Sequence, residues 1–493
     1  MTADSDDVAP SADRKPRTAL PDARRPRDPR RPTAPRGFLL PPAPIASLDE
    51  YLATETGGLG LRRAQDLGPA ATIDAIDRSG LRGRGGAGFP TGRKWSTIAA
   101  QPGSDRYLVV NGAEGEPGTF KDRALMRSNP YQLVEGTIIA AYAVDAVQAY
   151  IALKASFQRE RAAVLRAITE MQEAGICRDC RITLVAGPDE YLFGEEKALL
   201  EVIEGNEPLP RVLPPYEHGL FARAPQAGWQ ATEVSGSSTA SSNPTLVNNV
   251  ETLSNVPHIL VRGAEWFRAM GTPLSPGNVV ATVVGDVRWP AVGEVELGTP
   301  LRDVIETIGG GAQPGRSVKA VFTGVANAVV TADDLDAPFS YEGLQSAGSG
   351  LGAAGLIVYD DSACMVEAAR QVSRFLAVES CGQCPPCKLG AGEITQRLEH
   401  IERGDGTPHD VDEIVAWLAK VTDGSRCFLA TQERNVVASV LRAFGDEVSA
   451  HLAGACPRPR DLPLPLLVDL ADGVAQYDDR HRRKRPDWTY ASA

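Results

Sequence analysis

Four cysteines constrain the C-terminal part of this 493-residue chain more than any other feature of its sequence. Cys381, Cys384 and Cys387 have C-x2-C-x2-C spacing in ESCGQCPPCK, and Cys427 follows 40 residues later in DGSRCFLA. Clustered thiols in a large chain without a clean export signal are typical of metal or redox centres rather than of a disulfide framework. The arrangement predicts one four-thiolate centre that holds either an iron–sulfur cluster or zinc.

The spacing favours the cluster over zinc. Structural zinc is usually held by two C-x2-C pairs, whereas three close cysteines and a distant fourth are typical of a cubane [4Fe–4S] cluster. Gly382 and two prolines keep the loop tight enough for three sulfurs to converge. We therefore predict a [4Fe–4S] cluster, with zinc as the alternative.

The other four of the eight cysteines predict no second centre. Cys177 and Cys180 form a C-x-x-C in GICRDCR, but no second pair stands near them. Two reduced thiols are expected there, and a surface zinc or redox pair is the alternative. Cys364 and Cys456 stand alone in the sequence and are expected to be packed in the interior.

A glycine-rich segment, GLRGRGGAGFPTGRKW at 80–95, predicts a ligand site in the N-terminal half. Bare backbone N–H groups and the start of a helix near Thr91 can cradle a phosphate. Arg84 and Lys94 can add positive charge, and Phe89 offers an apolar face to a flat ring. The segment matches neither the P-loop nor the dinucleotide fingerprint, because it lacks Gly-Lys-Ser/Thr and follows an expected helix.

Two acidic segments strengthen this interpretation. NGAEGEPGTFKDR (111–123) follows an expected strand, so it lies at the carboxyl end of the strand, where open α/β sheets bind ligands. YLFGEEKALL (191–200) also follows a strand and starts a helix, where carboxylates can simply be favourable partners of the helix dipole. Acidic groups beside a phosphate loop suit a ligand that also carries hydroxyl or ring N–H donors, such as a flavin or a nicotinamide dinucleotide.

Composition excludes some other functions. The net charge of −12 argues against general nucleic-acid binding. No run reaches the ~18 apolar residues of a membrane span, so we expect no membrane insertion. The first 45 residues are rich in proline, arginine and aspartate and are expected to be a disordered arm. Prolines break the apolar stretch after its arginine pairs, which argues against export.

The pattern of the chain predicts three architectures in succession. Between residue 47 and about 262, helix-like and strand-like segments alternate, which predicts a mostly parallel sheet with helices on its faces. From 278 to about 335 the chain is β-rich with one helix, a small α+β unit. After Asp360 the pattern is helical, and an i+4 apolar stripe from Val436 to Leu452 predicts a bundle core.

Five motifs in this order resemble one known family. GRGGAGFPTGRKW, N-x-x-E-x-EPGTFKDR, Y-x-x-GEE-x-AL, PTLVNNVETL and ESCGxCxPC are similar to the NADH-binding flavoprotein subunit of respiratory complex I, NAD-reducing hydrogenases and NAD-dependent formate dehydrogenases. The resemblance covers roughly 47–457. It implies an α/β FMN-binding domain, a small β-grasp (SLBB) domain and a C-terminal helical bundle with an iron–sulfur cluster. The expected limits are 1–45 for the arm, 46–265 for the FMN/NAD domain with a flexible insertion at 223–243, 275–340 for the SLBB domain, 355–457 for the bundle and 458–493 for a solvated tail.

The resemblance also implies a set of binding residues. NAD(H) would stack on the flavin, with Phe89 and Glu116 as contacts and Glu196 nearby. The cluster ligands would be Cys381, Cys384, Cys387 and Cys427. The residues around FMN would be Gly83, Arg84, Gly85, Gly86, Ala87, Gly88, Lys94, Asn111, Glu114, Tyr191, Gly194, Glu195, Val247, Asn248, Asn249 and Thr252.

Some positions depart from the family pattern. Ala113 replaces an acidic flavin contact, and Thr97 stands where a phenylalanine stacks on the adenine side. Leu213 replaces a lysine and Tyr216 a phenylalanine in RVLPPY. These departures weaken the prediction of NADH binding more than the prediction of flavin binding.

The implied activity is that of an NADH dehydrogenase, or diaphorase, module. Hydride would pass between NAD(H) and FMN, and single electrons between FMN and the cluster, with no side chain needed as acid or base for the hydride. Both NADH oxidation and NAD+ reduction agree with the residues. The rivals are the same module fed by another donor such as ferredoxin, and a non-catalytic zinc and nucleotide scaffold.

We expect a cytoplasmic protein, free or peripheral to a membrane complex. The family implies separate partners, namely a thioredoxin-like [2Fe–2S] subunit, a dehydrogenase or hydrogenase catalytic subunit, or both.

Overall fold

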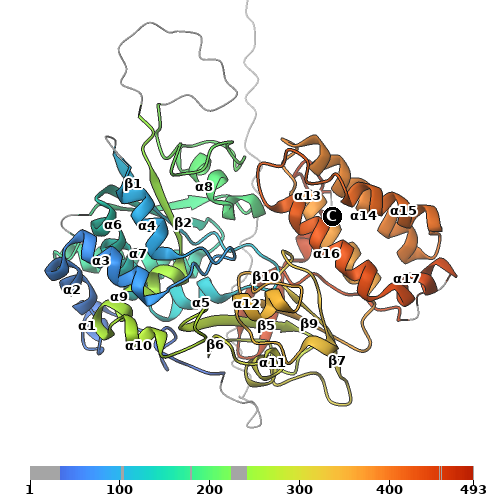
Figure 1. The fold of residues 1–493 in the computed structure, drawn as a ribbon, viewed down its shortest axis with the longest axis horizontal. Helices are drawn as coiled ribbons and strands as arrows, with labels where there is room; N and C mark the ends of the chain where they lie inside the picture. The colour runs from blue at the N-terminus through green and yellow to red at the C-terminus, as the bar shows by residue number, and fades with distance from the viewer. Residues whose placement is uncertain are drawn as a thin grey trace, which may run out of the picture. The chain divides into compact units, whose positions relative to one another are not determined.

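The computed structural model describes residues 34–101, 105–177, 180–223, 241–454, 456 and 458–491. Figure 1 shows the fold and labels most of its helices and several of its strands. Most of the arm expected at 1–45 and most of the insertion expected at 223–243 lie outside the described residues. In the described part of the chain, no helix is both long and apolar enough to cross a bilayer.

The first sheet has four parallel strands in the order β3-β2-β1-β4. Leu108, Val109 and Val110 of β1 are fully buried, as expected for a strand covered on both faces. All the carboxyl ends of the strands therefore lie at one edge. The strands are β1 (Arg106–Asn111), β2 (Ala146–Lys154), β3 (Ile182–Gly187) and β4 (Thr245–Asn249). This sheet confirms the mostly parallel α/β architecture predicted from the alternating pattern.

Helices surround this sheet. In α6, Asn129 caps the start by accepting from the N–H of Gln132, and Pro130 occupies the first turn, where its missing N–H costs nothing. The helices of this region are α1 (Leu48–Leu52), α2 (Leu59–Leu67), α3 (Pro69–Ser79), α4 (Thr91–Ala99), α5 (Lys121–Ser128), α6 (Pro130–Val144), α7 (Gln158–Glu173), α8 (Glu196–Ile203), α9 (Val250–Arg262) and α10 (Ala264–Arg268), with the short 3₁₀ helix η1 (Tyr191–Gly194) before α8.

The second sheet has five strands in the order β6-β5-β9-β7-β8. Its pairings are antiparallel except between β5 and β9. β9 lies in the range where we expected the helical bundle to start, but all six of its residues are buried between β5 and β7. The elements are β5 (Asn278–Gly285), β6 (Ala291–Glu296), α11 (Leu301–Gly309), β7 (Val318–Thr323), β8 (Val330–Thr331), η2 (Ala332–Asp334), α12 (Tyr341–Ser346) and β9 (Gly355–Asp360).

Helices follow β9 and are drawn in orange and red in Figure 1. Val436, Val440 and Val448 are buried, which agrees with the bundle core predicted from the apolar stripe. The stripe does not form one helix, because the chain breaks at Phe444 and α17 begins at Gly445. The helices are α13 (Met365–Glu379), α14 (Pro385–Arg403), α15 (Pro408–Leu418), α16 (Leu429–Ala443) and α17 (Gly445–Leu452).

The end of the expected N-terminal arm is folded. Leu39 and Leu40 are fully buried, and their amides donate to Oε2 of Glu294 on β6 at 2.9 and 3.0 Å. The prediction of disorder over 1–45 is therefore wrong for 34–45. Prolines exclude a helix there, but they do not prevent the apolar pair from packing.

The expected solvated tail is also folded from residue 458 to 491. It forms the hairpin β10 (Leu467–Ala471) and β11 (Val474–Tyr477), followed by η3 (Asp479–Arg483). Nε2 of His481 and Nζ of Lys484 lie 2.9 and 2.8 Å from Oε1 of Glu379, the last residue of α13. Burial alone would raise the pKa of Glu379, but the hydrogen bond from His481 and the positive charge of Lys484 lower it to about 2. The basic run is thus held by a buried carboxylate.

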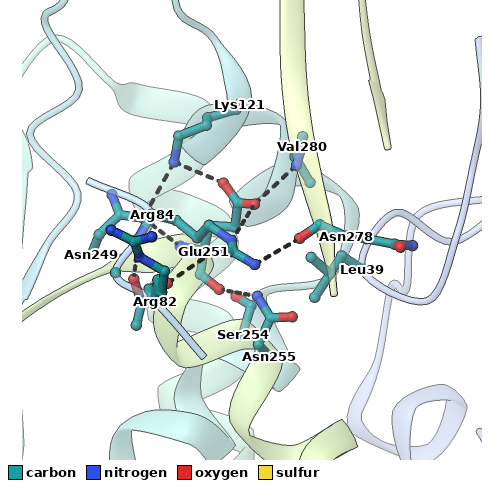
Figure 2. A network of polar contacts seen from close by, with 12 residues as sticks. Leu39, Arg82, Arg84, Lys121, Asn249, Glu251, Ser254, Asn255, Asn278 and Val280 are labelled. Carbon is teal, nitrogen blue, oxygen red and sulfur yellow. Dashed lines mark hydrogen bonds and ion pairs between the residues drawn. The ribbon is translucent and has the colours of Figure 1, made fainter. Parts of the chain in front are cut away.

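A second buried carboxylate, that of Glu251 on α9, joins the two sheets (Figure 2). Oε1 accepts from the N–H of Val280 on β5 at 2.9 Å, and Oε2 lies 3.0 Å from Nζ of Lys121. Nε of Arg84 lies 3.8 Å from Oε1, and the same guanidinium donates to the carbonyl oxygen of Asn278 at 3.0 Å. The side chains of Arg84, Lys121 and Glu251 are at most 1% exposed. One carboxylate therefore pairs with two buried cations from different segments, and the second negative charge comes from Asp122, whose Oδ1 lies 2.7 Å from Nζ of Lys121.

Removing this carboxylate is expected to destabilise the protein strongly. Glu251→Ala leaves the buried Arg84 without its carboxylate and Lys121 with Asp122 alone, a change that typically costs about 3–5 kcal/mol. The free energy of unfolding, followed by tryptophan fluorescence in denaturant, measures the loss. The control is Asp336→Ala, which breaks an ion pair between two exposed side chains. Asp336 is 80% exposed and its partner Arg302 is 54% exposed. That change should stay within about 1 kcal/mol, and equal losses in the two variants would contradict the role of Glu251.

Candidate functional site

The glycine-rich segment forms a closed loop between α3 and α4. The N–H of Gly83 donates to the carbonyl oxygen of Phe89 at 2.8 Å, which closes the loop. Gly86 and Gly88 have φ of 118° and 62°, in the region that favours glycine. A Cβ at Gly88 would lie 2.4 Å from the ring of Tyr341. The loop backbone is therefore open to solvent on one side and packed against Tyr341 on the other.

Arg84 holds the loop from inside. Its N–H donates to Oγ1 of Thr252 at 2.9 Å, and its guanidinium lies beside Glu251. The side chain thus faces the interior, which corrects the expectation that its charge would reach a bound phosphate. The sequence alone does not reveal this, because the partners lie more than 150 residues away.

Lys94, the other cation predicted for this site, follows the loop directly in the sequence. It lies on α4, and Nζ donates to Oε2 of Glu196, the first residue of α8, at 2.9 Å. Both side chains are partly exposed, at 30% and 41%. The next residue, Trp95, is buried and donates from Nε1 to Oδ1 of Asn248 at 2.8 Å, which fixes α4 against β4.

The carboxyl ends of β1 and β4 meet the loop. Asn249 ends β4, and a Cβ at Gly85 would lie 3.3 Å from the Cβ of Asn249. Oδ1 of Asn249 accepts from the N–H of Glu251, and its Nδ2 donates to Oδ2 of Asp122 at 2.7 Å. Asn111 ends β1 and donates to the carbonyl oxygen of Gly194 at 2.8 Å. The structure thus brings the three predicted binding segments to one edge of the parallel sheet.

Two carboxyl groups at this edge have raised pKa values. Glu114 accepts from the N–H groups of Asp122 and Arg123 at the start of α5. Burial, and then the charge of Asp122, raises the pKa of Glu114 to about 7. Glu195 caps α8 by accepting from the N–H groups of residues 197 and 198 at 2.9 Å, and burial raises its pKa to about 7. At neutral pH both groups can hold or release a proton.

Glu116 belongs to a chain of polar contacts that reaches the helical region. It accepts from the hydroxyl of Tyr191 and from the N–H of Val325, the latter at 2.7 Å. Nε2 of Gln432 on α16 in turn donates to the hydroxyl oxygen of Tyr191 at 2.7 Å. Burial raises the pKa of Glu116. The sequence did not point to Gln432, because only the fold brings this residue to Tyr191.

A polar cavity of about 140 Å³ lies beside Glu116. Lys154 at the end of β2, Asp189 beyond β3 and Glu379 line it, and the 458–491 segment covers it with His481 and Lys484. The sequence did not indicate this cavity, because the last segment was expected to be solvated.

The four predicted cluster cysteines meet at one small cavity. Its other lining residues include Leu192, Ser380 and Arg426. The N–H of Arg426 points at Sγ of Cys384 at 3.4 Å, and Oγ of Ser380 lies 3.4 Å from Sγ of Cys387. Four sulfurs around one space, with amide and hydroxyl donors beside them, fit the ligand set of a [4Fe–4S] cluster. The residues present therefore suit the centre predicted from the spacing.

The helix η1 links this cavity to the glycine loop side. Tyr191, at its start, binds Glu116, and the next residue, Leu192, lines the cysteine cavity. Lys197 on α8 donates to the carbonyl oxygen of Arg426, which precedes Cys427. The two predicted sites thus share one short segment.

The remaining cysteines differ from their expectations in one case. Cys177 and Cys180 are both buried. Cys364 and Cys456 do not stand alone, because their sulfurs and a ring nitrogen of His451 lie within 4.8 Å of one another. They are 92 residues apart in the sequence, so only the fold reveals the cluster.

Comparisons with known proteins agree with this geometry. Family models match residues 76–258 as a Nuo51 FMN-binding domain, 280–323 as an SLBB domain and 367–451 as an NADH-ubiquinone oxidoreductase-F iron-sulfur binding region. The chain is 37% identical over 412 residues to an NADH-quinone oxidoreductase subunit of Rhizobium meliloti, covering 81% of this chain and 93% of that protein. It is 34% identical to the HndC subunit of the NADP-reducing hydrogenase of Solidesulfovibrio fructosivorans, covering 84% and 82%.

A solved structure is also similar. An NAD+-reducing [NiFe]-hydrogenase in the H2-reduced state matches with a TM-score of 0.72 and 32% identity, covering 85% of this chain and 68% of that chain. The chain therefore belongs to the family of NADH dehydrogenase flavoprotein subunits, oxidoreductases that combine an FMN-binding domain, an SLBB domain and a helical region that binds a [4Fe–4S] cluster.

Proposed function

We propose that this chain passes electrons between NAD(H) and a partner iron–sulfur protein. The observation that carries the proposal is the position of η1. Its first residue, Tyr191, binds Glu116 near the expected flavin site, and its second, Leu192, lines the cysteine cavity. When bound, FMN exchanges a hydride with NAD(H) and single electrons with the [4Fe–4S] cluster. The protein's part is to hold these groups near one another and to keep water out.

The FMN phosphate would lie on the glycine loop. The exposed backbone at Gly85 and Ala87, the start of the nine-residue helix α4 and the charge of Lys94 all favour an anion there. Thr252 and Glu251 keep the loop in place through Arg84. The proposed FMN-binding residues are Gly83, Arg84, Gly85, Gly86, Ala87, Gly88, Lys94, Asn111, Glu114, Tyr191, Gly194, Glu195, Val247, Asn248, Asn249 and Thr252. Arg84 belongs to this set through its main chain alone, because its side chain faces the interior.

Glu114 and Glu195 can hold protons near the flavin. Each has a pKa of about 7 and is partly exposed, so each can be neutral at working pH and donate a hydrogen bond, or accept one when ionised. This allows the site to adapt to a ring whose charge changes with reduction.

NAD(H) would enter over the exposed face of the loop. Phe89 is half exposed and offers its ring, while Glu116 and Glu196 offer carboxylates to amide and hydroxyl donors. Hydrogen bonds from Tyr191 and Val325 keep Glu116 in one orientation. Binding of NADH is expected despite Thr97, which is exposed and leaves the adenine end without a stacking ring at that position.

The cluster would be held by Cys381, Cys384, Cys387 and Cys427. Apolar side chains reach the surface beside it, since Phe428 and Leu389 are 56% and 60% exposed. An apolar rim next to an electron-transfer centre suits a docking protein that must bring its own centre close. We propose that a separate [2Fe–2S] subunit, or the catalytic subunit of a dehydrogenase or hydrogenase, docks there.

Cysteine substitution tests the cluster assignment. Cys384→Ser and Cys427→Ser are each expected to lower the iron content well below the about four irons per chain of a [4Fe–4S] protein. Cys177→Ser removes a buried thiol outside the site and should keep the iron. Iron is measured by mass spectrometry on anaerobically purified protein, with FMN as an internal reference. Full iron in Cys427→Ser would exclude that ligand.

Glycine substitution tests the flavin site. Gly88→Ala meets the ring of Tyr341 and is expected to lose most bound FMN, whereas Gly348→Ala, at φ 77° with no atom within 4 Å, should retain it. Both variants carry the backbone cost of a positive φ, about 1–2 kcal/mol, so the difference isolates the loop. FMN is released by acid and measured by fluorescence. Equal FMN contents would contradict a role for this loop.

Anaerobic titration identifies the donor. NADH is expected to bleach the flavin absorbance of the wild-type protein within the mixing time. NADPH and reduced ferredoxin serve as parallel titrants. A flavin that remains oxidised with NADH but is reduced by ferredoxin would favour the alternative donor.

A charged substitution in the apolar rim formed by Leu389 and Phe428 tests the proposal that a partner subunit docks there. Phe428→Asp is expected to abolish co-purification of an iron–sulfur subunit under anaerobic conditions. Val415→Asp is the control, because Val415 is equally exposed at 57% but lies on α15, outside the cysteine cavity. The partner is identified by mass spectrometry, and NADH-driven reduction of its iron–sulfur centre is followed by absorbance. Unchanged electron transfer in Phe428→Asp with full iron would exclude this surface.

A further inference from the structure

Three potential metal ligands meet at the far end of α13 from the cysteine cavity. Sγ of Cys364, a ring nitrogen of His451 and Sγ of Cys456 all lie within 4.8 Å of one another. Cys364 is the residue that caps the start of α13, His451 lies on α17, and Cys456 follows α17. Cys364 and His451 are 1% and 0% exposed, and Cys456 is partly exposed.

The separation of Cys364 and His451 fits tetrahedral zinc. Bonds of about 2.3 Å to sulfur and 2.0–2.1 Å to nitrogen at a tetrahedral angle place the sulfur and nitrogen atoms about 3.5–3.6 Å apart. Sγ of Cys364 lies 3.5 Å from Nε2 of His451. The two atoms therefore already have the separation that a shared metal ion requires.

The orientation of His451 suits metal binding. Its Nδ1 lies 2.9 Å from the carbonyl oxygen of Glu447. A carbonyl can only accept, so Nδ1 carries the hydrogen and Nε2 presents its lone pair to the two sulfurs. A zinc-binding histidine usually donates its other ring N–H in a hydrogen bond, and a backbone carbonyl is a common acceptor.

The charge balance suits a divalent cation. Two thiolates and one Zn²⁺ sum to zero, which makes the burial of all three acceptable. Sγ of Cys364 also faces the N–H of Glu367 at 3.5 Å, in the first turn of the 15-residue helix α13. The carboxylate of Glu447, four residues before His451, is taken by Lys319, Arg458 and the N–H of Met365.

We propose that Cys364, His451 and Cys456 bind one Zn²⁺ ion, separate from the iron–sulfur centre, with water as the fourth ligand. A donor set of two sulfurs and one imidazole is typical of zinc among the abundant divalent metals. Among the described residues, no fourth histidine, cysteine, aspartate or glutamate joins the group. The partly exposed side of Cys456 gives water access to the open position.

The ion is distinct from the cluster in place and in role. α13 spans 15 residues between Cys364 and the loop that carries Cys381, about 22 Å at 1.5 Å per residue. The zinc would connect three parts of the chain: the start of α13 at Cys364, the end of α17 at His451, and the start of the last segment at Cys456. From that point Arg458 and Arg460 continue the contact, with Glu447 and Asp360 as their partners.

Metal analysis of the intact flavoprotein tests this site. Wild-type protein with full FMN and iron is expected to contain about one zinc per chain, because one such ligand group occurs in the described part of the chain. Cys364→Ser, His451→Asn and Cys456→Ser should each lose the zinc and keep the iron and the flavin. Cys456→Ser is the mildest of them, because the side chain is partly exposed. Cys180→Ser, a buried thiol elsewhere, is the matched control and should retain the zinc.

Zinc-edge X-ray absorption gives a readout that does not depend on activity. Two sulfurs at about 2.3 Å and two nitrogen or oxygen atoms at about 2.0–2.1 Å are expected. Four sulfurs would instead place the zinc in an empty cluster site and overturn the proposal. Absence of zinc from iron-replete protein, equal zinc in all variants, or a Cys364–Cys456 disulfide found by thiol labelling would each overturn it as well.

Discussion

The buried carboxylate of Glu251 is the interaction on which the rest of the structure depends. It lies in the first turn of α9, directly after the strand that supplies Asn248 and Asn249, and it pairs with Arg84 and, together with Asp122, with Lys121. Through Arg84 it fixes the glycine loop, and through Val280 it fixes the second sheet. A glycine loop has little intrinsic order, so a phosphate cradle needs such an anchor behind it. The anchor here is electrostatic and fully buried, which makes it rigid and costly to disturb.

The proposed electron route passes another short connection. Tyr191 and Leu192 are neighbours in η1, yet one binds Glu116 beside the glycine loop edge and the other lines the cysteine cavity. Gln432 on α16 completes the contact from the helical side. Because the same turn of chain faces both sites, a shift of the helical region relative to the first sheet would change the path between them. The polar contacts of Tyr191 oppose such a shift.

Local patterns predicted the elements well and their long-range contacts poorly. The strand at 106–111 and the helix at 130–144 match the structure. Their burial pattern and their capping residues can be read from neighbouring positions in the sequence. The C-x2-C-x2-C spacing likewise predicted a four-cysteine centre. By contrast, the inward turn of Arg84 and the meeting of Cys364 with Cys456 depend on residues far away in the chain. Charged and proline-rich ends were interpreted as solvated, since nothing near them shows that Leu39 packs beneath β6 or that Lys484 binds Glu379.

Glu379 explains why the basic end of the chain is folded. This carboxylate ends α13, one residue before Ser380 and the cysteine loop, and it is 2% exposed. It also accepts from the N–H of Tyr191 at 3.1 Å. An unpaired charge at this position would be expensive and would face both the flavin side and the cluster side. His481 and Lys484 neutralise it, so the last segment completes the electrostatics of the junction between the two centres rather than decorating its surface.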